Sequence, residues 1–290
     1  MSQKTVVQWL DFVPNGWRSM EQFLLGLDEA MRARGWQSVY VFAGEPSVLI
    51  KDRLQALGSP YLVSANPLTR AGAVALGRTL HAWRPALIQT HFLSKFDPAL
   101  RHVKRHSGAR RLVVADHSSG EASRKPWPLQ AMAWLRGRWA ARHVDLIVGV
   151  SDFVCRRDVE DVFFPAGQVV RVHNGVDTQR FAPPAQPPDN PVFTVAFVGQ
   201  LIRQKGVDTL VAAIKVLHDE GVPVRLVIAG QGPHGDALHE QVRRVGLVDQ
   251  VNFLGQIDWA ARLYGEADVV VAPSEWAEAF GFVVAEAAAA

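Results

Sequence analysis

Cysteine is almost absent from this 290-residue sequence, in which Cys155 is the single example. One thiol excludes an internal disulfide and any zinc site built from several cysteines. We expect Cys155 to be a small buried hydrophobic residue, because an isolated cysteine usually packs as one.

Long hydrophobic runs are also absent. Although 48% of the residues are hydrophobic, no stretch of 18 apolar residues occurs, so we expect no membrane-spanning helix. Residues 1–10 lack the basic region and long apolar stretch that mark a secretory signal. Length and composition therefore predict a cytoplasmic globular protein of about two domains.

Neither sign of charge is in large excess, because the formal net charge is only +3. Basic residues nevertheless gather in the first half, and residues 101–111 contain Arg101, Lys104, Arg105, Arg110 and Arg111. A basic surface can face nucleic acid, anionic lipid, a phosphorylated substrate or water alone. No recognisable nucleic-acid-reading module accompanies these residues, so we expect no nucleic-acid partner.

Short β-branched runs alternate with longer helical patterns. In the first half, strands are predicted at residues 5–9, 38–42, 86–90, 111–115 and 146–150, and a helix at residues 21–34. This alternation predicts a parallel sheet that is covered by helices on both faces. Such sheets bind ligands at the carboxyl ends of their strands.

A proline-rich connector interrupts the pattern at residues 182–191, which contain five prolines. We therefore predict an N-terminal domain at residues 1–185 and a C-terminal domain at residues 186–290. In the second half, strands are predicted at residues 193–198, 225–229, 250–253 and 268–272. A helix begins at residue 282 and the sequence ends within it, so we expect a truncated C-terminal domain.

Glycine turns follow the predicted strands of the second half. Gly199 and Gly230 each come directly after a strand, where a missing side chain lets the backbone approach a ligand. Lys205 precedes the next helix, where a cation and helix N–H groups could hold phosphates. A solvent-exposed lysine in an ordinary turn explains that motif equally well.

Two carboxylates, Glu278 and Glu286, flank a glycine turn near the end of the sequence. Glu278 falls in the loop after a predicted strand, and Glu286 falls in the second turn of the following helix. Carboxylates accept hydrogen bonds from sugar and ribose hydroxyls. The alternative is that both are ordinary helix and surface residues.

These segments together resemble the retaining glycosyltransferases of the GT-B fold, in the large family 4 group (glycosyl transferases group 1). The resemblance covers nearly the whole chain and is carried by the order and spacing of the motifs. Two first-half segments also match it: Ile147-Val148-Gly149-Val150-Ser151 and Val172-His173-Asn174-Gly175-Val176-Asp177. It implies an α/β protein with two Rossmann-like domains that face each other across a cleft.

The resemblance implies an enzyme that moves a sugar from a nucleotide diphosphate sugar to an acceptor hydroxyl with retention of configuration. The acceptor would be a glycan, a glycolipid or a polysaccharide precursor. Lys205 would contact the donor diphosphate, Glu286 the ribose, and Glu278 the transferred sugar. His117, which follows a predicted strand, would lie near the reacting sugar, although it could be an ordinary histidine at a strand end. The implied donor-binding set is completed by Gly16, Gly199, Arg203, Gly230, Phe280, Gly281 and Phe282.

Two positions depart from the family pattern. Gln200 stands where the family usually has an arginine, and Arg203 could take over its contact with phosphate. The loop near the N-terminus, usually glycine-glycine, is Asn15-Gly16 here. No Asp-x-Asp pair is present to hold a divalent metal, so we expect neither a metal nor another cofactor. Lys205, Arg203 and a helix N-terminus would instead neutralise the leaving diphosphate.

Residues 124–143 contain Trp127, Trp134 and Trp139 among five basic residues. A basic helix with tryptophans can lie on an anionic membrane surface, which would give a peripheral membrane contact and favour a lipid-linked acceptor. The interpretation we favour is that Trp134, Leu135 and Trp139 pack under the next strand while the arginines face water.

Two other functions remain open. One is a nucleotide-sugar epimerase of the same fold, and the other is a non-catalytic, regulatory copy that binds nucleotide. A degenerate copy would be expected to lack some of the implied site residues, but all four of the main ones are present: Lys205, Glu278, Glu286 and His117. Gln200, which departs from the family pattern, slightly favours a degenerate copy.

Overall fold

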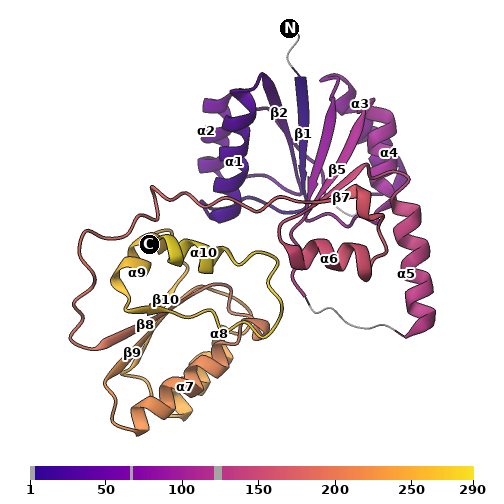
Figure 1. Cartoon of the computed structure of the whole chain (residues 1–290). Helices are drawn as coiled ribbons and strands as arrows, with labels where there is room; N and C mark the ends of the chain where they lie inside the picture. The colour runs from indigo at the N-terminus through magenta and orange to yellow at the C-terminus, as the bar shows by residue number, and fades with distance from the viewer. Residues whose placement is uncertain (1–3, 66–67, 121–125) are drawn as a thin grey trace. The chain divides into compact units, whose positions relative to one another are not determined.

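The computed structural model describes residues 4–65, 68–120 and 126–290, and it divides into two compact units. The first unit ends at Asn174 and the second runs from Gly175 to Ala290 (Figure 1). Each unit is an α/β fold with one parallel sheet, as the alternation of strands and helices predicts.

The sheet of the N-terminal unit has the strand order β3-β2-β1-β4-β5-β6-β7, and every pairing is parallel. Its strands are β1 (Lys4–Leu10), β2 (Trp36–Phe42), β3 (Tyr61–Val63), β4 (Leu87–His91), β5 (Arg111–Asp116), β6 (Leu146–Gly149) and β7 (Val169–Arg171). The helices are α1 (Ser19–Arg32), α2 (Val48–Leu57), α3 (Arg70–His81), α4 (Pro98–Ser107), α5 (Trp127–Ala140) and α6 (Asp152–Glu160).

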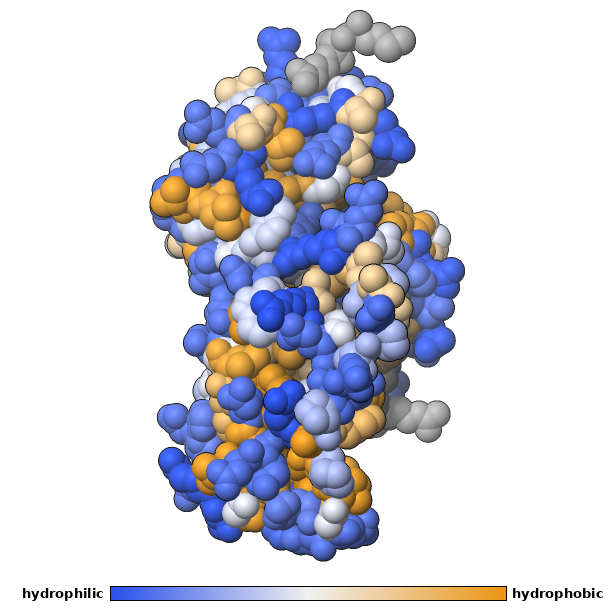
Figure 2. Space-filling model, turned by 90° about the vertical axis from the view of Figure 1, so that its left-hand side faces the viewer, coloured by the Kyte–Doolittle hydropathy of each residue, from blue (hydrophilic) through white to orange (hydrophobic). Residues whose placement is uncertain are grey.

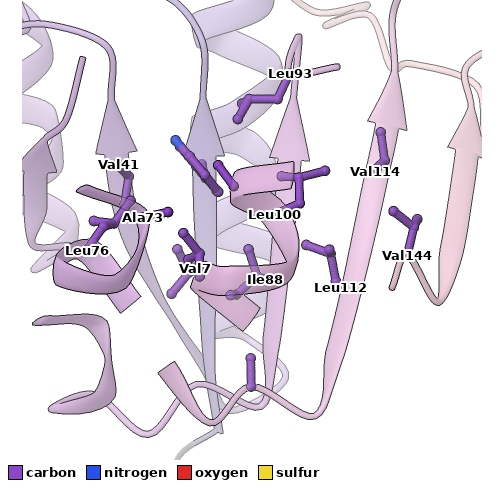
Figure 3. Close-up of a cluster of buried hydrophobic side chains, with 14 of the residues drawn as sticks. Val7, Val41, Ala73, Leu76, Ile88, Leu93, Leu100, Leu112, Val114 and Val144 are labelled. Carbon is purple, nitrogen blue, oxygen red and sulfur yellow. The ribbon is translucent and has the colours of Figure 1, made fainter. Parts of the chain in front are cut away.

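Helices cover both faces of this sheet. Side chains of α3, α4 and the end of α5 pack with the strands on one face, where residues such as Val7, Ile88 and Leu112 are buried. Figure 3 shows these side chains pointing toward one another from the strands and helices. Helices α1 and α2 cover the other face. Burial on both faces favours apolar residues in a strand, and Val6, Val7, Trp9 and Leu10 of β1 are buried.

Local sequence signals explain where several helices begin and end. The side chain of Asp97 accepts a hydrogen bond from the backbone N–H of Ala99, and Pro98 occupies the first turn of α4. The same helix ends at Gly108, whose φ of 74° suits a residue without a side chain. Ser151 caps α6 by accepting from the N–H of Val154.

The C-terminal unit contains a four-stranded parallel sheet of order β10-β9-β8-β11. Its strands are β8 (Phe193–Val198), β9 (Val224–Ala229), β10 (Val251–Gly255) and β11 (Val269–Val270). Its helices are α7 (Val207–Asp219), α8 (Gly235–Arg244), α9 (Ala260–Glu266) and α10 (Phe282–Ala289). Helices α7 and α8 pack on one face, and α9 packs on the other.

The division between the units falls after Asn174 rather than after residue 185, where the proline connector led us to place it. Residues just before the prolines belong to the C-terminal unit through two contacts. The guanidinium of Arg180 donates to the carbonyl oxygen of Asp258 at 3.0 Å, and the ring of Phe181 lies 6.0 Å from that of Tyr264.

Helix α5 corrects one prediction from the sequence. Trp139 packs against the core as expected, but Trp134 and Leu135 are exposed and do not pack under the next strand. Gly137 and Ala140 are the buried residues of this helix, so only its C-terminal half is held against the sheet. Arg124 and Lys125 lie outside the described residues.

Water-facing surfaces are mixed, as on most folded proteins. The face shown in Figure 2 is largely hydrophilic, with separate hydrophobic patches between charged residues. Cys155 is partly buried, with its thiol near the carbonyl oxygen of Gly149, rather than fully buried as predicted. Within the described ranges, none of the helices combines the length and apolar character that crossing a bilayer requires.

Candidate functional site

The glycine turns of the C-terminal unit interlock at the carboxyl ends of its strands. The N–H of Gly199 donates to the carbonyl oxygen of Ala229 at 2.9 Å, and the N–H of Gly230 donates to that of Gly255 at 2.7 Å. Gly230 has a φ of 151°, and a Cβ atom there would overlap the carbonyl oxygen of Gly199. Only glycine therefore fits this turn, which brings backbone to the ligand-binding edge of the sheet.

Lys205 lies in a short 3-10 turn, Arg203–Lys205, directly before α7. The next residue, Gly206, has a φ of 66°, and a side chain there would overlap the carbonyl oxygen of Pro273. The N–H of Glu275 donates to the carbonyl oxygen of Gln204 at 2.9 Å. This close approach joins the turn after β8 to the loop after β11.

Lys205 and Glu278 form an ion pair across these two loops. The hydroxyl of Ser274 also donates to Glu278 Oε1, at 2.6 Å. Burial raises the pKa of Glu278, but hydrogen bonds from Lys205 and Ser274 outweigh it and hold the pKa below its ordinary value. Glu278 is therefore ionised at neutral pH, and an incoming phosphate would compete with it for Lys205.

Glu286 is buried in α10 and accepts a hydrogen bond from the phenol of Tyr264 at 3.1 Å. Burial and the neighbouring carboxylate raise the pKa of Tyr264 above its usual range, so the phenol remains a donor. Tyr264 lies on α9 and was not singled out from the sequence. The bond holds the Glu286 side chain in one orientation.

The turn before α10 carries the remaining predicted residues of this edge. Gly281 is the N-cap of the helix with a φ of 79°, and the rings of Phe280 and Phe282 meet edge to face at 5.1 Å. The free N–H groups at a helix N-terminus attract anions. Arg203 is exposed on the same short turn as Lys205.

His117 and Gly16 belong to the N-terminal unit, while the other predicted site residues belong to the C-terminal unit. Gly16 lies in the loop between β1 and α1, where the guanidinium of Arg18 donates to the side chain of Asn15 at 3.1 Å. His117 follows β5 directly, as predicted, and its ring stacks on Phe92 at 4.9 Å.

A chain of hydrogen bonds connects His117 to two residues that the sequence analysis missed. His117 Nε2 lies 3.0 Å from Nδ1 of the buried His91, and His91 Nε2 lies 3.0 Å from Oε1 of the buried Gln8. The amide oxygen can only accept, so His91 carries its hydrogen on Nε2 and accepts through Nδ1. His117 must then carry its hydrogen on Nε2.

This assignment leaves His117 Nδ1 as a bare acceptor, and that buried atom has no hydrogen-bond partner within the described residues. Burial lowers the pKa of His117 to about 4, although the nearby carboxylate of Asp116 acts in the opposite direction. Burial also lowers the pKa of His91 well below its ordinary value. Both rings are therefore neutral at pH 7.

Asp116 fixes the start of the loop that carries His117. Its carboxylate accepts from Lys95, from the N–H and hydroxyl of Ser118, and from Arg157 at 3.4 Å. Burial opposes ionisation, but Lys95 and Ser118 outweigh it and lower the pKa of Asp116 to about 2. Lys95 also pairs with the buried Asp158, whose pKa is raised to about 6 by burial and by Asp116.

Among the described residues, no three His, Cys, Asp or Glu side chains are grouped so that they could hold a metal ion. The C-terminal unit offers one lysine with a carboxylate partner and a second buried carboxylate, and the N-terminal unit offers a neutral histidine.

Two family models divide the chain between them. The model described as Glycosyltransferase Family 4 matches residues 20–180, and the model described as Glycosyl transferases group 1 matches residues 178–290. Among solved structures, the Anabaena protein Alr3699/HepE in complex with UDP and glucose matches with a TM-score of 0.74 and 19% identity. That match covers 98% of this chain and 78% of the Anabaena chain. A glycosyltransferase from Rickettsia africae matches with a TM-score of 0.76 and 15% identity, over 100% of this chain and 78% of the other.

Curated relatives also match, but the matched region is a smaller share of each relative's own length than it is for the two solved structures. Glycogen synthase from Mycobacterium tuberculosis is 27% identical over 73% of this chain and 52% of the relative. The phosphatidyl-myo-inositol mannosyltransferase of Mycobacterium leprae is 28% identical over 96% of this chain and 73% of the relative. The match thus spans about half of the first relative and nearly three quarters of the second. The chain belongs to the glycosyltransferases that the two family models describe.

Proposed function

We propose that this chain transfers a sugar from a nucleotide diphosphate sugar to a hydroxyl of a glycan or lipid-linked acceptor, with retention of anomeric configuration. The observation that carries the proposal is the Lys205–Glu278 pair at the carboxyl edge of the second sheet, where the Gly199 and Gly230 turns also meet. A cation at this edge can bind phosphates, and a carboxylate can accept hydrogen bonds from hydroxyls. The glycine turns have no side chains there, so a ligand can approach the backbone closely.

In this proposal the donor diphosphate replaces Glu278 as the ion-pair partner of Lys205. Lys205, Arg203 and the N-terminus of α10 then neutralise the charge that grows on the diphosphate as the glycosidic bond breaks. Glu278, released from the lysine, accepts from the hydroxyls of the transferred sugar. Glu286, oriented by Tyr264, accepts from the ribose hydroxyls.

Retention requires that the acceptor hydroxyl attacks the face from which the diphosphate leaves. The bond between the anomeric carbon and the phosphate oxygen breaks, and the bond to the acceptor oxygen forms. The proton of the acceptor hydroxyl passes to the departing phosphate oxygen. His117, directly after β5, would lie near the reacting sugar.

Similarity to the structures with bound ligands supports the donor class. Alr3699/HepE was solved with UDP-glucose, and starch synthase IV of Arabidopsis thaliana with ADP and acarbose. A lipid-linked acceptor is supported by the resemblance to a mannosyltransferase named for phosphatidyl-myo-inositol.

The test begins with a thermal-shift panel of uridine, guanosine and adenosine diphosphates. A nucleotide at 100 times its dissociation constant should stabilise the protein by roughly 2.7 kcal/mol. The sugar nucleotide with the matching base is then incubated with glycan and lipid-linked acceptors, and NMR of the product determines its anomeric configuration. Interconversion of the sugar nucleotide without transfer would indicate an epimerase, and binding without turnover would indicate a regulatory copy. An inverted product would overturn the retaining mechanism.

A further inference from the structure

Helix α5 exposes an unusual amount of apolar surface. The exposed fractions are 79% for Trp127, 45% for Leu129, 50% for Met132, 51% for Trp134 and 62% for Leu135. Successive helical residues turn by about 100°, so these five side chains spread over roughly 220° of the helix circumference. Residues 126–132 and 134–136 are all exposed. The N-terminal half of α5, about 12 Å long from Trp127 to Leu135, therefore meets solvent on every side. In Figure 1, α5 runs along the edge of its unit.

Positive charge follows directly on this apolar half. Arg136 and Arg138 are exposed in the last turns of α5, and Arg142 lies just beyond its end. No acidic residue occurs between Glu121 and Asp145. Isolated apolar exposure is common on proteins, but a contiguous apolar segment beside a basic one indicates a binding surface.

Basic side chains of α4 extend the positive region. The amino group of Lys104 donates to the carbonyl oxygen of His143 at 3.0 Å. Burial lowers the pKa of His143, and the positive charges of Arg101, Lys104 and Arg142 lower it further. Part of this charge is balanced by Asp145, which pairs with Lys104 and with Arg111.

We propose that α5 docks this protein onto an anionic membrane surface. Trp127, Leu129, Met132, Trp134 and Leu135 enter the boundary between headgroups and acyl chains, while Arg138, Arg142 and Arg101 lie against the phosphates. A fluid lipid layer can cover all sides of an apolar helix end, whereas the groove of a folded partner covers one face. Tryptophans suit the boundary because their rings are apolar and their N–H groups are polar.

A second copy of the chain fits this surface less well. A symmetric dimer that pairs parallel α5 helices would place Arg138 and Arg142 of one copy near the same residues of the other, and like charges in an interface repel. An anionic lipid surface provides the opposite charge at the same place. The proposal does not depend on the transferase activity, because binding to lipid is measured without a sugar donor.

Sedimentation with vesicles tests the proposal. The chain is mixed with vesicles of phosphatidylcholine alone, or of equimolar phosphatidylcholine and phosphatidylglycerol, and the bound fraction is measured at low and high salt. We expect binding to the anionic vesicles that weakens with salt, because salt screens charge. Each arginine near an anionic surface contributes about fivefold in affinity, so Arg138→Glu/Arg142→Glu should lower affinity at least about thirtyfold.

Matched variants separate this surface from general stickiness. Trp134→Ser/Leu135→Ser should lower vesicle affinity by at least about tenfold, since two apolar side chains no longer leave water. Its control, Val216→Ser/Val248→Ser, removes two exposed apolar residues of the C-terminal unit and should bind like the parent. Arg243→Glu/Arg244→Glu on α8 is the control for charge.

Brominated lipids report direct contact. They should quench tryptophan fluorescence of the bound parent, and the quenching should fall in Trp127→Phe/Trp134→Phe while vesicle binding persists. Failure of the parent to bind anionic vesicles would overturn the proposal, as would equal losses in the α5 variants and their controls. Dimers in sedimentation velocity that disappear in Trp134→Ser/Leu135→Ser, without lipid binding, would assign the surface to a second copy instead.

Discussion

Lys205 is the residue at which nucleotide affinity can be tested most directly, because its ammonium group faces the carboxylate that a phosphate would displace. Lys205→Ala should weaken nucleoside diphosphate binding by about 1.5–3 kcal/mol, the usual effect of losing a charged hydrogen-bond partner. Glu286→Ala should have a similar effect through the ribose. Lys215→Ala, which removes an exposed surface pair with Asp219, is the control. Calorimetry that finds unchanged affinity in Lys205→Ala would place the diphosphate elsewhere.

His117 should affect turnover rather than nucleotide affinity. A group that acts mainly in the transition state changes the rate without much change in ground-state binding. We therefore expect His117→Ala to cut sugar transfer severely and to leave diphosphate affinity nearly intact. His91→Leu should lower the transfer rate in the same way, because His117 Nε2–H then loses its acceptor.

The state of the His117 ring distinguishes positioning from simple packing. Nitrogen-15 NMR should show the Nε2–H tautomer of His117 in the parent and a mixture of tautomers in His91→Leu. Transfer at the parent rate by His117→Ala would show that the ring is only structural.

Sequence motifs pointed to candidate site residues beside glycine turns or strand ends, such as His117 and Glu286. They did not point to the side chains that hydrogen-bond to these two residues. Gln8 is 83 residues from His91 along the chain, so no local pattern joins them. The available signal was Gln8 itself, a polar residue between the apolar Val7 and Trp9 of β1. Tyr264 was missed because α9 is short and its contact with Glu286 spans 22 residues.

At the scale of the helix, alanine substitutions at one glycine of α5 and one of α1 test how closely each helix packs against its neighbours. A Cβ atom at Gly137 of α5 would overlap the carbonyl oxygen of Val162, whereas one at the exposed Gly26 of α1 would meet nothing within 4 Å. Gly137→Ala should therefore destabilise the protein by about 1–3 kcal/mol through overpacking. Gly26→Ala should stabilise it by about 0.5–1 kcal/mol because alanine is the better helix former. Urea denaturation measures both, and a stabilising Gly137→Ala would show that α5 is not held against residue 162.

Long buried strands were the most predictable elements, because β-branched runs between glycine turns have few alternatives. The strand at residues 193–198 agrees at both ends with β8, and most others agree within one or two residues. Strands β3 and β7 were missed, since three residues at a sheet edge show no pattern. The packing of α5 was mispredicted because a tryptophan-rich helix favours burial when the extent of the sheet beneath it is unknown.

The pH dependence of stability follows from buried histidines in the N-terminal unit. An unfolded histidine has a pKa of about 6.5, whereas the pKa of folded His117 is lowered to about 4 and that of His91 is also lowered. The unfolded chain therefore binds more protons between these values, so the free energy of unfolding falls as pH decreases through this window. His117 alone contributes about 3 kcal/mol.

Asp158 acts in the opposite direction, because its pKa is raised to about 6 and the folded state holds the extra proton. His117→Asn should consequently flatten the fall in stability between about pH 6.5 and 4, and Asp158→Asn should make it steeper. Urea titrations at a series of pH values measure these slopes. Identical slopes in both variants and the parent would contradict the assignment.

For the whole molecule, the final prediction concerns how the leaving diphosphate is neutralised. Sugar transfer should persist when divalent metals are chelated. Lys205 and Arg203 occupy one turn beside the edge at which we propose that phosphate binds, and α10 begins after the neighbouring loop. These groups can balance the developing charge where other enzymes use a metal. The sequence also has no Asp-x-Asp pair.

Transfer rates with EDTA, with added magnesium and with added manganese provide the measurement. The three rates should agree, and Lys205→Ala should be slow in all three because the missing cation is part of the chain. Complete loss of activity in EDTA that returns with metal would contradict the prediction. In that case a metal ion and the ammonium group of Lys205 would together neutralise the charge that develops on the diphosphate, and Lys205 alone would not be sufficient.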